Sequence, residues 1–232
     1  LFLDDVPRSL FLTRNTYGAM LNLITLPATA YFIGPKQSDY RSSILWGMIL
    51  FVLFFAVFQT GSKGSIISLS LGLIFIFVIS WKYIENSSFI PVVIIVTAAF
   101  LFANIQTEGY TVNRLDELSV KSLDPSLAGR LIIWQSAWEI IKTAPVIGIG
   151  IGTFFIVFPA VRNPADSTHG NYLHNDYLQF WLETGFIGLC IMMLIIVAIS
   201  ILFLRVLKNK NIVLHDRLEI TGLISGLLAV AI

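Results

Sequence analysis

Long apolar runs constrain the fold of this chain more than any other feature. A helix that crosses a bilayer needs about 20 predominantly apolar residues, and the sequence holds five such runs and the start of a sixth. They lie at about residues 16–33, 43–58, 65–83, 89–105 and 185–206, and from about residue 218 onward. Charged residues make up only 12% of the 232 positions, whereas soluble domains carry about 25%. We therefore expect an all-α membrane protein, built as a polytopic bundle of transmembrane helices.

The first two runs leave a second interpretation open. The run at about residues 16–33 is the most polar of the set, and both it and the next run can be read as buried helices instead of membrane spans. The chain between them is too short for a separate domain. Because the chain begins without Met and stops inside an apolar run, we expect it to be a piece of a longer protein.

Basic residues orient the expected spans, because cytoplasmic turns carry an excess of Lys and Arg. The basic turns, which lie on one side by parity, carry Lys36, Arg41, Lys82, Arg205, Lys208, Lys210 and Arg217. The opposite short turn, at residues 60–64, has only Lys63. We therefore expect four spans in residues 1–105, a long extracytoplasmic loop at 106–183, and the fifth and truncated sixth spans in 184–232.

The residue inventory argues against several other classes. A net charge of +1 gives no global field for binding nucleic acid. Cys190 is the only cysteine and there are three histidines, which is a poor set of metal ligands. Asp166, His169 and His174 lack a metal-binding spacing, so we expect no metal and no cofactor.

The long loop is too rich in aromatic and aliphatic residues for disorder. Periodicity predicts a helix at about residues 129–143, with Arg130, Trp134 and Trp138 on one face. Pro145 would end it, and a second short helix at about 175–184 would run into the fifth span. The glycines at 148, 150 and 152 have the wrong spacing for a dinucleotide site, so they predict a tight turn between loop helices.

The sharpest string is His-Asn-Asp-Tyr-Leu-Gln at residues 174–179. In one interpretation His174 shares a helix face with Tyr177 and exchanges a proton near neutral pH. In the other, Asn175 or Asp176 starts a helix, and Tyr177 and Trp181 form an aromatic belt at the membrane surface. Spacing alone leaves both interpretations open.

Three basic residues are candidates for binding an anion on the outer side. The Arg130 fork suits phosphate oxygens, although Arg130 can instead pair with Asp124 or a lipid headgroup on an amphipathic helix. Lys63 lies in a Gly- and Ser-rich helix start that suits an anion, although a plain short turn explains the same string. Arg14 lies at the outer end of the first run, although the excess of Lys and Arg is expected on the cytoplasmic side. Asp4 and Asp5 can pair with it instead.

Taken in order, these strings resemble the O-antigen ligase and polymerase superfamily of bacterial envelope enzymes. The strings are Gly-Ser-Lys-Gly at 61–64, Gly-Arg-x-x-x-Trp at 129–134, Pro-x-x-Gly-x-Gly at 145–150, the string at 174–179, and Gly-x-x-Gly at 185–188. The resemblance implies a multi-span glycosyltransferase of the GT-C type in the bacterial inner membrane. Such enzymes take a glycan from an undecaprenyl-diphosphate carrier on the outer face. The acceptor is lipid A-core, a growing glycan or a protein hydroxyl.

The resemblance also implies roles for residues. His174 corresponds to an essential loop histidine and Arg130 to an essential loop arginine, which we expect to be the catalytic pair. Lys63 stands where many relatives have arginine. Lysine keeps the positive charge but cannot bind two phosphate oxygens with parallel N–H donors as a guanidinium does. The residues expected to bind substrate are Lys63, Arg14, Trp134, Tyr177, Asn175 and Asp176.

Rival classes remain beside the ligase interpretation. Within the superfamily, a polysaccharide polymerase differs only in its acceptor. A transporter of the same lipid-linked glycan would place polar groups at the membrane midplane, whereas the ionisable residues here gather outside the apolar runs. A structural envelope protein would tolerate the loss of His174.

Overall fold

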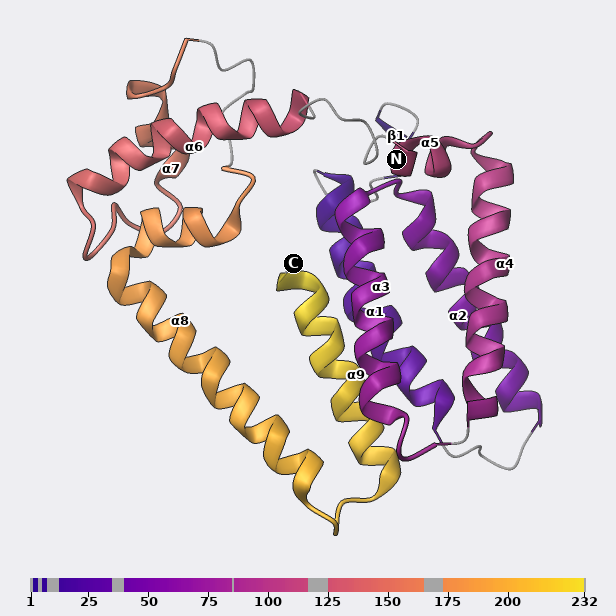
Figure 1. The fold of residues 1–232 in the computed structure, drawn as a ribbon. Coiled ribbons are helices and arrows are strands. Elements are labelled where there is room, and N and C mark those ends of the chain that lie inside the picture. The colour runs from indigo at the N-terminus through magenta and orange to yellow at the C-terminus, as the bar shows by residue number, and fades with distance from the viewer. Residues whose placement is uncertain are drawn as a thin grey trace. The chain divides into compact units, whose positions relative to one another are not determined.

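A computed structural model of the chain describes residues 2–3, 6–7, 13–34, 40–84, 86–116, 125–164 and 173–231. It is an all-α protein apart from one pair of two-residue strands, β1 (Phe2–Leu3) and β2 (Val6–Pro7) (Figure 1). The strands are antiparallel, with Phe2 opposite Pro7 and Leu3 opposite Val6. The chain forms two compact units, which are Leu1–Ser119 with Phe203–Ile232, and Val120–Leu202.

The first unit is a helical bundle. Its long helices are α1 (Arg14–Ile33), α2 (Tyr40–Gln59), α3 (Lys63–Ser80), α4 (Ile90–Gln106) and α9 (Leu214–Ala231). The short elements are the 3-10 helix η1 (Asn86–Phe89) and α5 (Tyr110–Asp116). These bounds agree with the predicted apolar runs to within a few residues, because each run is closed by polar turn residues.

Not every predicted span is apolar enough to cross a membrane on composition alone. In the described part of the chain, three helices are long and apolar enough, namely α2, α3 and α8 (Asp176–Lys208), and α4 is a shorter apolar helix. The helices α1 and α9 fall short because they carry more polar residues. The polar residues in the middle of the two helices are buried where α1 packs against α9 and α3, namely Asn22, Thr25, Thr29, Thr221 and Ser225, whereas Asp216 and Glu219 are exposed.

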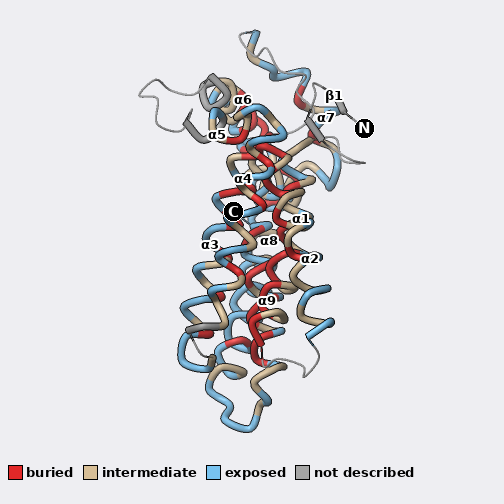
Figure 2. Tube along the Cα trace, turned by 90° about the vertical axis from the view of Figure 1, so that its right-hand side faces the viewer, coloured by how far each residue is buried: buried red, intermediate tan, exposed pale blue. Residues whose placement is uncertain are grey.

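Small and neutral polar residues allow α1, α3 and α9 to approach closely, as is common between membrane helices. A stripe of buried positions runs along α9 (Figure 2) and includes Gly222, Ser225 and Gly226. A Cβ added at Gly222 would lie 2.6 Å from the Cβ of Ala30. The fully buried Asn22 donates to the Ser65 carbonyl at 2.8 Å and to Ser68 Oγ at 2.9 Å. The polarity of the first predicted span is therefore used in helix packing.

The second unit is built on the predicted loop and most of α8. Its elements are α6 (Pro125–Thr143), α7 (Phe154–Val157), the 3-10 helix η2 (Phe158–Ala160) and α8 as far as Leu202. The helix predicted at 129–143 begins one turn earlier, at Pro125, a residue that is favoured at the first helical position. A separate apolar core joins these elements and consists of Ile133, Ala137, Ile140, Ile141, Phe154, Phe158, Leu173 and Leu182.

A break at Gly185 divides α8 into a short helix and a long apolar helix. Gly185 has φ +68° inside the helix, a left-handed conformation that costs glycine little. The predicted short helix at 175–184 running into a span is therefore confirmed. The predicted boundaries at 105/106 and 183/184 follow membrane topology, whereas the compact units divide at 119/120 and 202/203, so the topological division stays a prediction.

Candidate active site

The His-Asn-Asp-Tyr-Leu-Gln string forms the start of α8. Asn175 Oδ1 accepts a hydrogen bond from the Leu178 N–H at 3.0 Å, and the Asn175 carbonyl accepts from the Gln179 N–H at 3.0 Å. Asn175 is therefore the helix N-cap, as the capping interpretation predicted. The expectation that His174 shares a helix face with Tyr177 is wrong, because His174 precedes the helix, whereas proton exchange by His174 stays a prediction.

The backbone of His174 is in the left-handed region, with φ +53°. This conformation is uncommon for a residue other than glycine and costs on the order of 1–3 kcal/mol. Contacts on both sides hold it in place. The Leu173 carbonyl accepts from Trp134 Nε1 at 2.9 Å, and the Leu173 N–H donates to Gln179 Oε1 at 3.4 Å. With Asn175 fixed as the cap, His174 is held between two anchored neighbours.

The electrostatic surroundings of His174 favour its neutral form. Partial burial of the imidazole, and after it the positive charge of Arg130, lower the pKa of His174 below its usual value of 6.5. The carboxylate of Asp176 acts in the opposite direction. Because the side chain is still exposed, the neutral imidazole is accessible to a substrate and able to accept a proton at neutral pH.

Arg130 and the tryptophans of α6 lie in the same unit as His174. Arg130 is half-buried and near enough to His174 for its charge to affect the imidazole. Trp134, one turn further along α6, packs against the apolar core, and its indole N–H donates to the Leu173 carbonyl. The indole ring of Trp138 contacts that of Trp181 edge to face, with centroids 5.5 Å apart.

Two aromatic residues of α8 complete the surroundings. Tyr177 is 48% exposed, so its ring offers more accessible surface than that of Trp134. Trp181 packs against the core, and its Nε1 is buried with no partner among the described residues. Binding of substrate by Trp134, Tyr177, Asn175 or Asp176 stays a prediction.

Glu183 is a buried residue that the sequence analysis missed. It is only 9% exposed, and its Oε2 accepts from the Gly152 N–H at 2.8 Å. Its Oε1 accepts from Gln179 Nε2 at 3.1 Å, and Gln179 in turn contacts Leu173. Glu183 thus connects the glycine turn to the residue before His174. The signal was present, since Glu183 is a lone acid in an apolar stretch before a span.

The glycine turn after α6 is hydrogen-bonded to the backbone of α8 just before its break at Gly185. The Ile149 and Gly150 N–H groups donate to the carbonyls of Leu182 and Glu183 at 3.0 and 2.9 Å. Gly148 has φ +70°, and a Cβ there would lie 2.4 Å from the Glu183 carbonyl oxygen. The prediction of a tight glycine turn, in preference to a dinucleotide site, is therefore confirmed.

A second polar cluster lies in the first unit, where α1 and α3 begin. Ser62 caps α3 by accepting from the Ser65 N–H at 3.2 Å, and its hydroxyl donates to Asn15 Oδ1 at 2.8 Å. This contact brings Arg14 and Lys63, the first residues of the two helices, to one end of the bundle. Some of the polar groups of the predicted anion site are therefore already used in hydrogen bonds between Ser62, Ser65 and Asn15.

Tyr110 is the partner of Arg14 among the described residues, and the sequence analysis missed it. Arg14 Nη1 donates to the Tyr110 hydroxyl at 2.8 Å. The Tyr110 ring also covers Gly61, where a Cβ would lie 2.3 Å from the ring. Asp4, Asp5 and Asp124, the acids proposed as alternative partners of Arg14 and Arg130, lie outside the described residues.

The structure thus groups the predicted site residues in two sets. His174, Arg130, Trp134, Tyr177, Asn175 and Asp176 belong to the second unit, and Arg14 and Lys63 to the first. Convergence of Arg130 and Lys63 on one anion stays a prediction. Within the described ranges, no group of three or more His, Cys, Asp and Glu residues could hold a metal ion, and Asp166 and His169 lie outside those ranges.

The fold and the site define a helical integral membrane protein in which the second compact unit carries His174 and Arg130. A profile of the O-antigen ligase family matches residues 48–193, more than half of the chain. The chain therefore belongs to the O-antigen ligase family, as the resemblance predicted.

Individual relatives are more distant. An uncharacterized protein of Haemophilus influenzae is 22% identical over 219 residues, which cover 89% of this chain and 54% of the relative. The exopolysaccharide production protein ExoQ of Rhizobium meliloti is 29% identical over 80 residues, which cover 32% of this chain and 18% of the relative. The chain thus spans about half the length, or less, of these curated relatives. No solved structure matches it significantly.

Proposed function

We propose that the chain is part of a membrane glycosyltransferase of the O-antigen ligase type. It moves a glycan from an undecaprenyl-diphosphate carrier to an acceptor hydroxyl on the outer face of the bacterial inner membrane. Membership of the family supports the class of reaction. The observation that carries the proposal is His174, which is exposed, anchored on both sides and favoured in its neutral form beside Arg130.

His174 acts as the general base. The acceptor oxygen forms a bond to the anomeric carbon while the bond from that carbon to the diphosphate oxygen breaks, and the diphosphate leaves with the electron pair. A ring nitrogen of His174 takes the hydroxyl proton of the acceptor. General base catalysis contributes typically about 10²–10⁴-fold, and the lowered pKa keeps the imidazole ready to accept.

Arg130 stabilises the negative charge of the departing diphosphate. A guanidinium presents parallel N–H donors that match phosphate oxygens, and such charge stabilisation is often the largest catalytic contribution. Lys63 and Arg14, the first residues of α3 and α1, are proposed as donors for the phosphate oxygens of a lipid-linked substrate. The reaction uses neither a nucleotide sugar nor a metal, because the donor carries its own leaving group.

Two features favour this proposal over transport. Asn22 and Ser225, which are buried in the middle of the bundle, are neutral, and each donates a hydrogen bond to a neighbouring helix. The ionisable residues of the described helices gather near helix ends, as do Arg14, Lys63 and Arg217. A polymerase of the same superfamily is the alternative within the class, and it would pass the glycan to another glycan.

The proposal is tested by reconstituting the full-length protein in vesicles with an undecaprenyl-diphosphate-linked glycan. Lipid A-core, a free glycan and a hydroxyl-bearing peptide are offered as acceptors, and acceptor-dependent release of undecaprenyl diphosphate is measured. We expect release with lipid A-core. Release only with the free glycan would indicate a polymerase, and release only with the peptide a protein glycosyltransferase. A protein that moves the intact donor across the vesicle without cleaving it would be a transporter.

Variants of His174 separate its chemical role from its structural one. His174→Ala should lower transfer by about 10²–10⁴-fold without loss of membrane insertion. His174→Asn is the matched control, because Asn tolerates the left-handed backbone but is not a base, and it should be equally inactive. If His174→Gln restores transfer, the ring only donates a hydrogen bond. If His174→Ala transfers at the native rate, His174 is only a neighbour of the helix cap.

The topology of the loop needs its own measurement. We propose that residues 106–183 face the periplasm, because the basic turns lie on the opposite side by parity. A reporter fused after residue 166 should be active only outside the cytoplasm. A cytoplasmic reporter signal there would remove the outer-face mechanism.

A further inference from the structure

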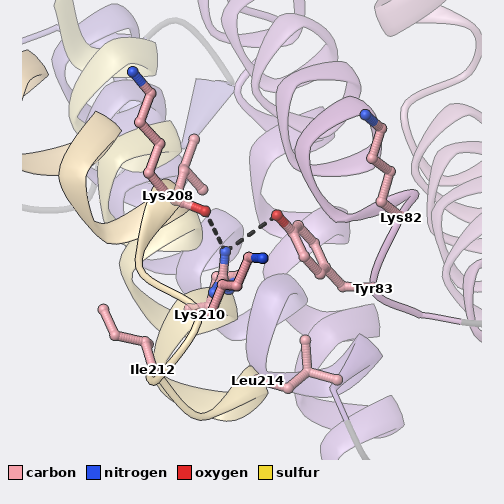
Figure 3. A pocket seen from close by; sticks show the side chains of 8 residues that line it. Lys82, Tyr83, Lys208, Lys210, Ile212 and Leu214 are labelled. Carbon is pink, nitrogen blue, oxygen red and sulfur yellow. Dashed lines mark hydrogen bonds between the residues drawn. The ribbon is translucent and has the colours of Figure 1, made fainter.

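A basic cavity of about 570 Å³ lies in the first unit, where α3 and α8 end and α9 begins. It is far along the bundle from Arg14 and Lys63, since α3 carries Lys63 at its first turn and the cavity just beyond its last. Its lining residues are Lys82, Tyr83, Leu207, Lys208, Lys210, Ile212, Leu214 and Arg217 (Figure 3). Four of the eight are cations and none is an acid.

Arg217 is the buried cation of the cavity and is held by several contacts. Arg217 is only 6% exposed; its Nη1 donates to the Tyr83 hydroxyl at 3.1 Å and to the Leu207 carbonyl at 2.5 Å, and its Nη2 donates to the Asn209 carbonyl at 2.7 Å. The guanidinium carbon also lies 4.6 Å from the centroid of the Tyr83 ring. Arg217 thus satisfies the carbonyls at the end of α8, and it fixes Tyr83 with its hydroxyl hydrogen still available to donate.

The positive charges of the three lysines are not neutralised by side chains of the fold. None of the Lys82, Lys208 and Lys210 side chains makes a hydrogen bond or ion pair with a described residue. The C-termini of α3 and α8 together present about one unit of negative charge, and the bound Arg217 already offsets it. Asp216 lies in the first turn of α9 and Glu219 pairs with His215, but neither lines the cavity. About three positive charges, those of the lysines, therefore remain without compensation in the cavity.

We propose that this cavity binds the phosphate group of an anionic phospholipid. The Lys82, Lys208 and Lys210 ammonium groups and the Tyr83 hydroxyl supply donors for phosphate oxygens. Leu207, Ile212 and Leu214 supply an apolar wall for the start of an acyl chain. Basic pockets between membrane helices are suited to such headgroups. The apolar wall favours a lipid over a free phosphate compound, and the site is separate from the proposed glycan transfer.

The test measures lipid retention by the full-length protein. Detergent-purified protein is incubated with phosphatidylglycerol or phosphatidylcholine, and bound lipid is counted by native mass spectrometry. We expect phosphatidylglycerol to be retained selectively. The triple variant Lys82→Gln, Lys208→Gln, Lys210→Gln should retain it at least about tenfold less, because each basic group near an anionic lipid contributes severalfold to affinity.

Controls separate the cavity from general charge. A second triple variant, Arg41→Gln, Lys142→Gln, Arg162→Gln, removes the same charge elsewhere and should retain the lipid to within about twofold of the wild type. The triple Lys→Arg variant should also retain it, and circular dichroism checks that each variant is folded. Equal retention by the Lys→Gln variant, or equal binding of phosphatidylcholine by the wild type, would overturn the proposal. Displacement of phosphatidylglycerol by glycerol 3-phosphate would overturn the lipid source in favour of a soluble phosphate ligand.

Discussion

The two compact units use glycine and buried polar groups in different ways. In the first unit, glycines such as Gly72 lie inside helices and let neighbouring helices approach, and the buried polar groups are neutral except for Arg217 near the start of α9. In the second unit, Gly148 and Gly185 adopt positive φ, and a buried carboxylate, Glu183, ties the turn to the helix. Apolar packing joins the helices of both units, and in the second unit a few hydrogen bonds at the joint formed by the glycine turn and the break in α8 add to it.

This difference concentrates the functional geometry at the joint. The chain of contacts from Gly152 through Glu183 and Gln179 reaches Leu173, the neighbour of His174. A small change at the joint is therefore expected to move the proposed base. A comparable change inside the bundle is expected to lower stability without moving it.

The largest effect is expected for Gly185→Ala. The new Cβ would lie 2.2 Å from the Val146 carbonyl oxygen at a residue with φ +68°, so a backbone clash adds to a left-handed cost of about 1–3 kcal/mol. We expect transfer activity to be lost and residues 125–184 to become more sensitive to limited proteolysis.

Gly72→Ala is the matched comparison in the bundle. Its new Cβ would lie 2.4 Å from Leu26 Cδ1, a side-chain atom that can move, so the cost is that of overpacking, about 1–3 kcal/mol. Thermal unfolding and proteolysis compare the two variants. A Gly185→Ala protein that is no more perturbed than Gly72→Ala would remove the distinction between the units.

A smaller effect is expected for Asn22→Leu in the bundle. The substitution removes both hydrogen bonds that the Asn22 amide donates, one to the Ser65 carbonyl and one to Ser68 Oγ, and each such bond contributes about 0.5–1.5 kcal/mol net. Denaturant unfolding in detergent should show this loss, with transfer activity per folded molecule unchanged. Ser68→Ala should cost less, because the Asn22 amide keeps its bond to the Ser65 carbonyl, although the two bonds made by the Ser68 hydroxyl are lost. Loss of activity in folded Asn22→Leu protein would place the bundle interior in the mechanism.

The pH dependence of transfer should respond to charge changes in the second unit. A general base must be deprotonated, so kcat/KM should rise with pH through the pKa of His174 and level off near neutral pH. Arg130→Gln removes a positive charge that lowers this pKa, so the rising limb should move to higher pH. Asp176→Asn removes a charge that raises it, so the limb should move to lower pH. Limbs that stay in place in both variants would show that another group titrates.

The smallest effect is expected for Gly64→Ala. A Cβ there would meet nothing within 4 Å, and Gly64 lies in the first turn of α3. Replacing a helical glycine by alanine should stabilise the protein by up to about 1 kcal/mol. The midpoint of thermal unfolding would show this gain. A clear loss of stability would mean that the start of α3 needs the open surface at Gly64.

Local features of this protein were determined by the sequence itself. The apolar runs fixed the helices to within a few residues, because burying apolar side chains in lipid or in a bundle requires a minimum length. The Asn175 cap, the end of α6 before Pro145 and the glycine turn at 148–152 also follow from neighbouring residues. The family resemblance followed from the same short strings.

The pairings between distant segments were decided only by the tertiary structure. Arg14 contacts Tyr110, 96 residues away, Trp134 contacts Leu173, 39 residues away, and Glu183 contacts Gly152, 31 residues away. The left-handed conformation of His174 and the burial of the polar faces of α1 and α9 depend on such pairings. A periodic pattern shows which face of a helix is buried, but the partner of that face depends on how all the helices pack together.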